Sequence, residues 1–325
     1  MPYYDLPKDE LTAYAPELIW PHDADLFWST TLADSRAAAQ SPVWHRIDTG
    51  LTLVDTFDVT FSGFGGHPVR AWMHLPAKIE DPVPAVVRFQ GYGGGRGLPL
   101  EVSAWTLAGY ASVIMDTRGQ GASWSPGDTA DPVGAAPSHP GFMTRGILDP
   151  NEYYYRRVYT DAVLTVDAAR SHPMVRRDKV VVTGASQGGG ISLAVAALVP
   201  DLWAVLVDVP FLCDFRRATQ IVDTDPYGEI VRYIKTHRDQ ADSVFSTLSY
   251  FDAAALAKLA KAPALFSVAL MDDICPPSTV YAAYNSYGGN KEIVEYPFNG
   301  HEGGQAFHQT VQVRWLASLD ESLGG

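Results

Sequence analysis

Short apolar runs recur along the chain and alternate with stretches of helical character. Each run is bounded by turn-forming residues, which is typical of strands buried in a sheet. The strands predicted in this way are 83–89, 110–115, 180–183, 205–208, 264–270 and 293–296. Between them lie helical patterns such as 153–170, where apolar side chains recur at intervals of three and four residues. This alternation predicts an α/β protein with a mostly parallel central sheet flanked by helices.

Three segments depart from this alternation. Residues 1–45 mix polar and aromatic side chains, and we expect an N-terminal helical extension that wraps the body. Residues 51–61 and 68–76 alternate in a way that indicates a pair of antiparallel strands. The charged stretch 212–255 reads as a helical insertion that shapes the pocket or a subunit contact. One core with these additions accounts for the whole length, so we expect a single domain over 1–325.

A sharp turn is predicted directly after the strand 180–183. The sequence Gly184-Ala185-Ser186-Gln187-Gly188 lies between this strand and the helical stretch 191–198, which is the context of a nucleophile elbow. Glycines tolerate the strained angles and the close approach of strand and helix that such a turn needs. Ser186 is therefore the candidate nucleophile. The alternative is that Ser186 only caps the following helix.

A serine hydroxyl also needs a base, and the base needs a group that orients it. In the fold that carries this elbow, the chain order is serine, acid, histidine. Asp272 and Asp273 follow the strand 264–270, and His301 lies in a glycine-flanked loop after the strand 293–296. These positions lie beyond the carboxyl ends of strands, where α/β sheets place their sites. The residues alone leave open which aspartate orients His301.

A glycine-rich turn, Gly91-Tyr92-Gly93-Gly94-Gly95, follows the strand 83–89. Its spacing does not fit a dinucleotide-binding loop, because Arg96 stands where the third glycine belongs. The position after an early inner strand favours a different task. We expect the N–H of Tyr92 to form an oxyanion hole together with the N–H of Gln187. The alternative is a flexible turn that binds nothing.

Composition narrows the class of protein. Of the 325 residues, 24 are Lys or Arg and 37 are Asp or Glu, and the net charge of −13 argues against nucleic acid and anionic membranes as partners. No apolar run is long enough for a transmembrane helix, and the N-terminus has no secretory pattern. Cys213 and Cys275 are too few for a disulfide framework and too far apart for a metal knuckle. We expect a cytoplasmic enzyme with small-molecule substrates and with neither a metal nor a cofactor.

Three motifs in this order resemble the signatures of the acetyl xylan esterase and cephalosporin C deacetylase family, carbohydrate esterase family 7. They are Asp116-Thr117-Arg118-Gly119-Gln120-Gly121, Gly184-Ala185-Ser186-Gln187-Gly188-Gly189-Gly190 and Gly300-His301-Glu302. The similarity extends over nearly the whole chain. It implies an α/β-hydrolase fold. It also implies a serine esterase that removes acetyl groups from small acetylated sugars, xylo-oligosaccharides and cephalosporin C.

The resemblance also implies roles for individual residues. Ser186 matches the nucleophile, His301 the base and Asp272 the orienting acid, which resolves the choice between the two aspartates. Tyr92 and Gln187 match the oxyanion donors.

Arg118 and Gln120 match a motif that looks structural in this family, and we expect them to tether loops around the nucleophile. The resemblance further implies a homohexamer whose active sites open to an internal cavity.

Other classes of protein use the same fold. A serine peptidase would use the same three side chains, but its added propeller domain is not found in this sequence. A dienelactone-type hydrolase commonly has cysteine where Ser186 stands. A binding protein on this fold would be expected to have lost one of the three side chains, and none is lost here.

Overall fold

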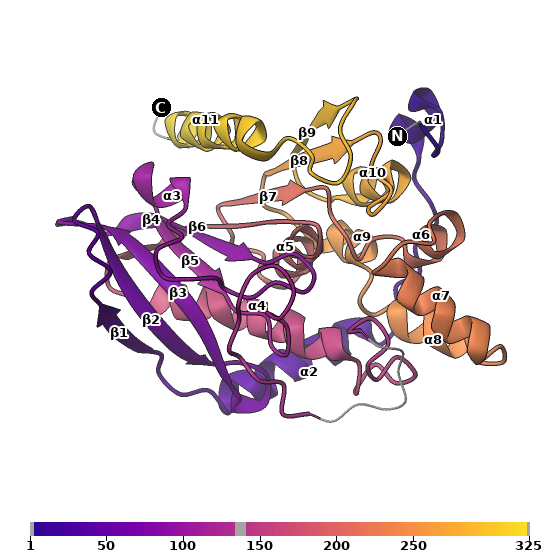
Figure 1. The fold of residues 1–325 in the computed structure, drawn as a ribbon, viewed down its shortest axis with the longest axis horizontal. Coiled ribbons are helices and arrows are strands. Elements are labelled where there is room, and N and C mark those ends of the chain that lie inside the picture. Colours follow the sequence, from indigo (N-terminus) through magenta and orange to yellow (C-terminus); the bar gives the residue numbers. More distant parts are fainter. Residues whose placement is uncertain (1–2, 134–140, 324–325) are drawn as a thin grey trace.

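The computed structural model describes residues 3–133 and 141–323, which fold around a nine-stranded sheet (Figure 1). The strands are β1 (Val43–Ile47), β2 (Val54–Ser62), β3 (Pro68–Pro76), β4 (Val83–Phe89), β5 (Ala111–Met115), β6 (Val175–Ala185), β7 (Ala204–Asp208), β8 (Ala264–Ala269) and β9 (Lys291–Tyr296). Their order across the sheet is β1-β2-β3-β5-β4-β6-β7-β8-β9. The strands from β5 to β9 pair in parallel, whereas β1, β2 and β3 are antiparallel to their neighbours. The predicted, mostly parallel sheet is confirmed.

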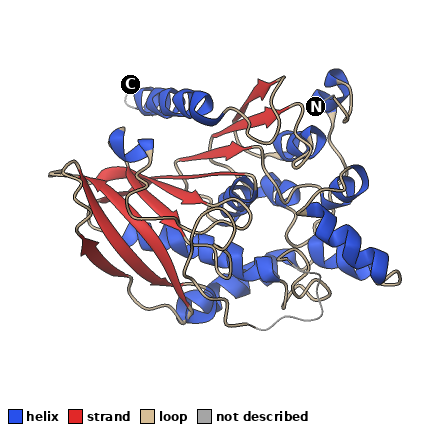
Figure 2. Cartoon of the chain, viewed as in Figure 1, coloured by secondary structure: helices blue, strands red, loops and turns tan. Residues whose placement is uncertain are grey.

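Helices cover both faces of this sheet (Figure 2). The helices are α1 (Lys8–Ala13), α2 (Ala24–Ala37), α3 (Ala104–Leu107), α4 (Tyr154–Ser171), α5 (Gln187–Leu198), α6 (Phe215–Ile221), α7 (Tyr227–Thr236), α8 (Ala241–Leu248), α9 (Ala253–Leu256), α10 (Pro277–Ser286) and α11 (Gln305–Leu323), with 3-10 turns η1 (Phe64–Gly66) and η2 (Ala257–Leu259). The main core lies between the sheet and α4 and α5. On the other face, Trp105 of α3 and Leu316 of α11 pack with Leu206 of β7. Among the described residues, no helix combines the length and the apolar character needed to cross a membrane.

Two boundaries differ from the sequence prediction. β1 begins at Val43, inside the range 1–45 that was expected to be helical. It is an edge strand with little buried surface, so the alternation of apolar and polar positions is too weak to reveal it. Helix α5 begins at Gln187 instead of near 191, because Gly188, Gly189 and Gly190 are helical despite their low propensity. Close packing of those glycines against neighbouring backbone offsets that cost.

Four helices, α6 to α9, lie between β7 and β8, and the segment 212–255 covers all of them except the last residue of α9. In Figure 1, α6, α7 and α8 lie together at one side of the molecule, away from the antiparallel strands. Asp225 and Pro226 of this segment line a pocket that also contains Ser186. The segment therefore contributes to the wall of that pocket.

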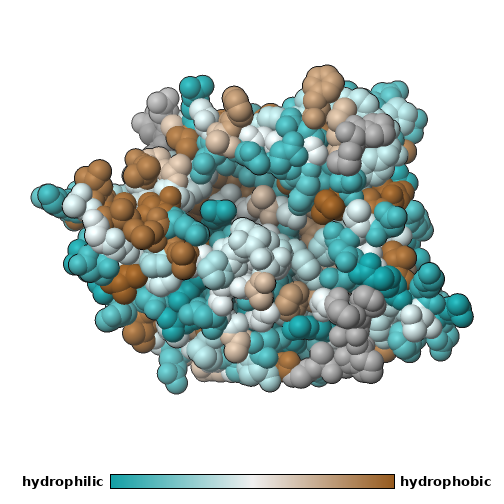
Figure 3. Space-filling model, in the orientation of Figure 1, coloured by the Kyte–Doolittle hydropathy of each residue, from teal (hydrophilic) through white to brown (hydrophobic). Residues whose placement is uncertain are grey.

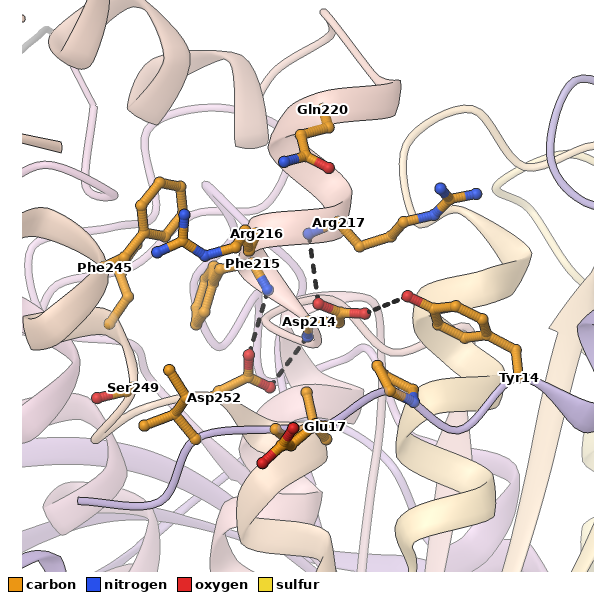
Figure 4. A pocket seen from close by; sticks show the side chains of 14 residues that line it. Tyr14, Glu17, Asp214, Phe215, Arg216, Arg217, Gln220, Phe245, Ser249 and Asp252 are labelled. Atoms are coloured by element: carbon orange, nitrogen blue, oxygen red, sulfur yellow. Dashed lines mark hydrogen bonds between the residues drawn. The ribbon is translucent and has the colours of Figure 1, made fainter. Parts of the chain in front are cut away.

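A second cavity, of about 370 Å³, lies between residues 14–19 and the helices α6 and α8 (Figure 4). The carboxylates of Asp214 and Asp252 line it. Asp214 accepts a hydrogen bond from the Tyr14 hydroxyl at 2.9 Å. Asp252 accepts bonds from the backbone N–H groups of Asp214, Phe215 and Ala254. These contacts cap α6 and α9 and attach the N-terminal segment to them, so the cavity's carboxylates serve the fold.

Candidate active site

Ser186 stands at the tip of the turn that joins β6 to α5. Its backbone has φ 58° and ψ −121°, a left-handed conformation that is strained for a residue with a side chain. Its N–H donates to the Asp208 carbonyl at 3.0 Å. Its own carbonyl accepts from the N–H groups of Gly190 at 3.1 Å and Phe211 at 2.9 Å. Three backbone hydrogen bonds thus hold the strained residue in place.

The glycines of the elbow are required by the close approach of strand and helix. A Cβ atom on Gly188 would lie 2.2 Å from the Phe89 carbonyl oxygen. A Cβ atom on Gly184 would lie 2.4 Å from the backbone carbon of Gly188. Both distances are shorter than any van der Waals contact, so side chains at these positions would push α5 away from the sheet. The pattern Gly-x-Ser-x-Gly therefore has a direct steric cause.

Asp272 and His301 meet beyond the carboxyl ends of β8 and β9. The His301 Nδ1 atom lies 2.9 Å from Asp272 Oδ2 and 3.2 Å from Oδ1. The carboxylate of Asp272 is fully buried, and its Oδ1 also accepts the N–H groups of Ile274 and Cys275 at 2.9 Å. These bonds fix the carboxylate, and the carboxylate fixes the imidazole plane. The backbone carbonyl of the adjacent Asp273 accepts a hydrogen bond from the Thr224 hydroxyl at 2.9 Å.

Ser186 and His301 line the same pocket, which has a volume of about 460 Å³. The walls also include Arg88 of β4, Tyr92 of the glycine-rich turn and Trp124. His301 keeps 32% of its side-chain surface exposed while Asp272 is completely covered. The imidazole therefore has its Nδ1 edge against the buried acid and part of its surface open to the pocket that Ser186 also lines.

The glycine-rich turn is fixed on its outer side. The Tyr92 hydroxyl donates to Glu229 Oε1 of α7 at 2.7 Å and accepts from the Phe142 N–H at 2.6 Å. Burial raises the pKa of the Tyr92 hydroxyl and that of the Glu229 carboxyl. The Trp124 indole N–H donates to the Tyr92 carbonyl at 2.9 Å. The side chain and the carbonyl of Tyr92 are thus both engaged, which leaves its N–H as the polar group with a free direction.

The two predicted oxyanion donors have no protein acceptor within the described part of the chain. Neither the Tyr92 N–H nor the Gln187 N–H donates a hydrogen bond there. Gln187 is the first residue of α5, where backbone N–H groups have no partner within the helix. The positive end of the helix dipole adds to the attraction for negative charge at this point.

Gln120 connects the glycine-rich turn to the elbow. Its Oε1 accepts from the Gly93 N–H at 2.7 Å, and its Nε2 donates to Gln187 Oε1 at 2.9 Å. The side chain of Gln187 is fully buried and also donates to the Gln90 carbonyl at 3.1 Å. Amide side chains can donate and accept at once, which is why two glutamines can link these segments.

Arg118 lies behind the pocket and does not line it. Its guanidinium is buried and forms a bidentate pair with Asp161 of α4, at 2.6 and 2.7 Å. Asp161 also accepts the N–H of Phe64 at 2.8 Å. Arg118 therefore joins α4 and η1 to the loop that carries Gln120.

These features agree with a comparison of the sequence with known families. Residues 1–319 match the family model described as "Acetyl xylan esterase (AXE1)". The chain belongs to the acetyl xylan esterase family. It is a carboxylic ester hydrolase, and its fold is the α/β-hydrolase fold.

Solved structures and a curated relative agree with this family membership. The acetyl xylan esterase from Paenibacillus sp. R4 superimposes with a TM-score of 0.91 at 36% identity, covering 96% of this chain and 99% of that one. Acetyl Xylan Esterase 1 from Thermoanaerobacterium sp. JW/SL YS485 gives a TM-score of 0.89 at 32% identity, covering 97% and 99%. Acetyl esterase Axe7A from Xylanibacter ruminicola is 26% identical over 93% of this chain and 69% of its own length.

One neighbour of Ser186 in this esterase is not predicted from the sequence. The Cys275 sulfur lies 3.9 Å from Ser186 Oγ and is fully buried. Burial, together with the charge of Asp272, raises the pKa of the thiol, so Cys275 stays protonated. The side chains of Asp272, Cys275 and His301 lie close enough for a metal site. A zinc site would need the thiolate, which this environment disfavours.

Proposed function

We propose that this esterase removes acetyl groups from small acetylated sugars, xylo-oligosaccharides and cephalosporin C through an acyl-enzyme on Ser186. The observation that carries the proposal is the buried Asp272 carboxylate bonded to His301, which lines one pocket together with the strained Ser186. Nucleophile, base and acid thus come from three separate segments. Family membership supports acetyl ester hydrolysis, and the precise substrates are our proposal.

In the first half of the reaction, the Ser186 hydroxyl attacks the acetyl carbonyl while His301, as a neutral imidazole, accepts its proton. The negative charge that develops on the carbonyl oxygen is stabilised by the N–H groups of Tyr92 and Gln187. The bond to the alcohol oxygen then breaks, and His301 returns the proton to that oxygen. Asp272 keeps the imidazole in the required tautomer and stabilises its protonated form.

Water completes the cycle. His301 takes a proton from the water, whose oxygen attacks the acetyl-serine, and the same two N–H groups stabilise the second tetrahedral intermediate. Acetate leaves, and the proton returns to Ser186. In this scheme Gln120 and Arg118 touch no reacting atom and act by positioning the turn and the elbow.

The alcohol part of the substrate has a flat apolar surface available. Trp124 lines the pocket and is 58% exposed, while its N–H is held by the Tyr92 carbonyl. An aromatic ring fixed in this way offers a face to the C–H groups of a sugar ring. We propose that Trp124 packs against the deacetylated sugar.

Hydrolysis of 4-nitrophenyl acetate, butyrate and octanoate tests the proposed function. We expect kcat/KM to be highest for acetate, and we expect Ser186→Ala to lose activity on all three esters. An unchanged rate in Ser186→Ala would remove the esterase mechanism. A preference for octanoate in the unmodified chain would remove acetyl specificity.

A further inference from the structure

One cation in the wall of the active-site pocket has no role in the chemistry described above. Arg88 is the penultimate residue of β4, and its side chain is exposed to the pocket that contains Ser186 and His301. Its neighbours along the strand, Val87 and Phe89, are buried on the opposite face. The alternation of the strand thus directs Arg88 to the face covered by α3 and α11.

The guanidinium of Arg88 is not used to stabilise the described part of the fold. Within residues 3–133 and 141–323, its guanidinium forms no ion pair and donates no hydrogen bond. The acidic groups that influence it, Asp208 and Glu101, act only through their field. The Asp208 carboxylate accepts hydrogen bonds from the side-chain amide of Gln312 at 2.9 Å and from the Ser267 hydroxyl at 3.0 Å.

Arg88 is the arginine that lines this pocket among the described residues, and two other arginines, Arg96 and Arg232, differ from it in being paired with carboxylates. Arg96 is bonded to Asp58 and Asp128, and Arg232 is bonded to Asp225. A guanidinium is planar and permanently charged, and it binds a carboxylate through two parallel hydrogen bonds. The surrounding protein partly desolvates Arg88 and lowers its pKa, but an arginine in this setting keeps its charge.

We propose that Arg88 binds an anionic group on the alcohol part of the substrate, so that the enzyme favours acetyl esters of carboxylate-bearing alcohols such as sugar acids. This inference rests on the proposed function above. The acetyl part of the ester has no ionisable group, so an anionic group on the intact substrate belongs to its alcohol part. Removal of acetyl from the ester leaves that anionic alcohol bound beside Arg88 until it departs.

A pair of esters that differ only in charge tests the proposal. The probes are 4-acetoxybenzoate, which is anionic, and 4-acetoxybenzamide, which is neutral and has nearly the same shape. The measured quantity is the ratio of kcat/KM for the anionic ester to kcat/KM for the neutral ester. We expect this ratio to fall about tenfold in Arg88→Gln and to be largely retained in Arg88→Lys, because a charge-assisted hydrogen bond contributes that much. Comparing variants cancels the intrinsic reactivity of the two esters.

A matched control removes a positive charge elsewhere. Arg176 lies near the N-terminal end of β6, which is the end away from Ser186, and it forms an exposed ion pair with Asp178. Arg176→Gln changes the net charge by the same amount and should leave the ratio as it is. An equal ratio in the unmodified chain and Arg88→Gln would overturn the proposal.

Product inhibition in the unmodified chain gives a second readout that needs no variant. We expect 4-hydroxybenzoate to inhibit hydrolysis of the neutral ester more strongly than 4-hydroxybenzamide does. Equal inhibition by both would contradict a role for Arg88. Loss of all esterase activity in Ser186→Ala, in contrast, concerns only the acyl-enzyme mechanism, so the two proposals fail separately.

Discussion

At the scale of single residues, few side chains of the site line the pocket, and several buried side chains hold them in place. Ser186 and His301 line the pocket, while Asp272, Gln120 and Arg118 are buried behind it. Each of these buried groups makes several hydrogen bonds, which leaves it little freedom to move, and in the proposed mechanism it positions the groups that react. A change at one of them should therefore alter turnover more than substrate binding.

Gln120→Leu tests this division of roles. The substitution removes the acceptor for the Gly93 N–H and the donor to Gln187, so the turn that carries Tyr92 loses the link to the elbow that Gln120 provides. We expect kcat for 4-nitrophenyl acetate to fall about 10- to 100-fold with little change in KM, as small misplacements of catalytic groups do.

The control for Gln120→Leu is Gln240→Leu, which removes a hydrogen bond from the Tyr233 hydroxyl outside the pocket. Steady-state kinetics of both variants decide the point. A higher KM with an unchanged kcat in Gln120→Leu would contradict the positioning role.

At the scale of elements, the contact between β4 and α5 is set by glycines. Gly188→Ala would place a Cβ atom 2.2 Å from the Phe89 carbonyl oxygen, and overpacking of this kind costs about 1–3 kcal/mol. Gly50→Ala is the comparison, because nothing lies within 4 Å of its Cβ position and its cost comes only from the backbone strain of φ 75°. Urea unfolding should show a larger loss for Gly188→Ala. A loss no greater than that of Gly50→Ala would refute the steric explanation.

The junction between α6 and α9 gives a prediction for pH. Burial raises the pKa of Asp252 from 3.8 to about 7. The folded state therefore binds the Asp252 proton more tightly than the unfolded state does, and this contribution to stability is lost as the pH rises from about 4 through 7. In Asp252→Asn the titration is absent. We expect Asp252→Asn to be less stable, since the carboxylate accepts three backbone N–H groups, and the advantage of the unmodified chain to shrink between pH 4.5 and 8.

Denaturant unfolding at several pH values measures this difference directly. Asp242→Asn, on the exposed first turn of α8, controls for the loss of a charge. An advantage that grows with pH would show that the Asp252 carboxylate is stabilised in the folded state.

The sequence predicts the elements with strong patterns and misses those that depend on distant contacts. The apolar runs at β4, β6 and β8 and the glycine-bounded elbow carry local signals, and all are found. β1 is missed because it is an exposed edge strand. Its hydrogen bonds to β2 hold it in place, so it needs no strong pattern of apolar side chains. Cys275 is not predicted beside Ser186, because its position depends on how the loop after β8 folds over Asp272. The spacing of residues along the sequence does not reveal Arg88 either, because only the register of β4 in the sheet places its side chain in the pocket.

At the scale of the whole molecule, exposed apolar side chains gather on one part of the surface. Leu98, Leu100 and Leu107 are each more than half exposed, and Figure 3 shows hydrophobic atoms gathered over the region where Figure 1 places α3. Contiguous apolar surface of this kind is typical of interfaces. We propose that this surface is an interface of the homohexamer that the family resemblance implies.

Sedimentation velocity tests the assembly. We expect a species with the mass of six chains, and Leu107→Glu should lower that mass because the charge would be buried at the interface. Lys258→Glu, at an already charged surface position in η2, is the control. The hexamer should also deacetylate xylobiose acetates faster than acetylated xylan polymer. A monomer that is equally active on both would exclude the proposed assembly.

The acyl-enzyme itself is the most direct test of the central claim. The enzyme is mixed with 4-nitrophenyl acetate, quenched with acid during turnover and digested, and the peptides are weighed by mass spectrometry. We predict that the peptide containing Ser186 gains the mass of one acetyl group, and that the corresponding peptide from Ser186→Ala does not. Turnover without any acetylated peptide, or acetyl on another residue such as Cys275, would contradict the account.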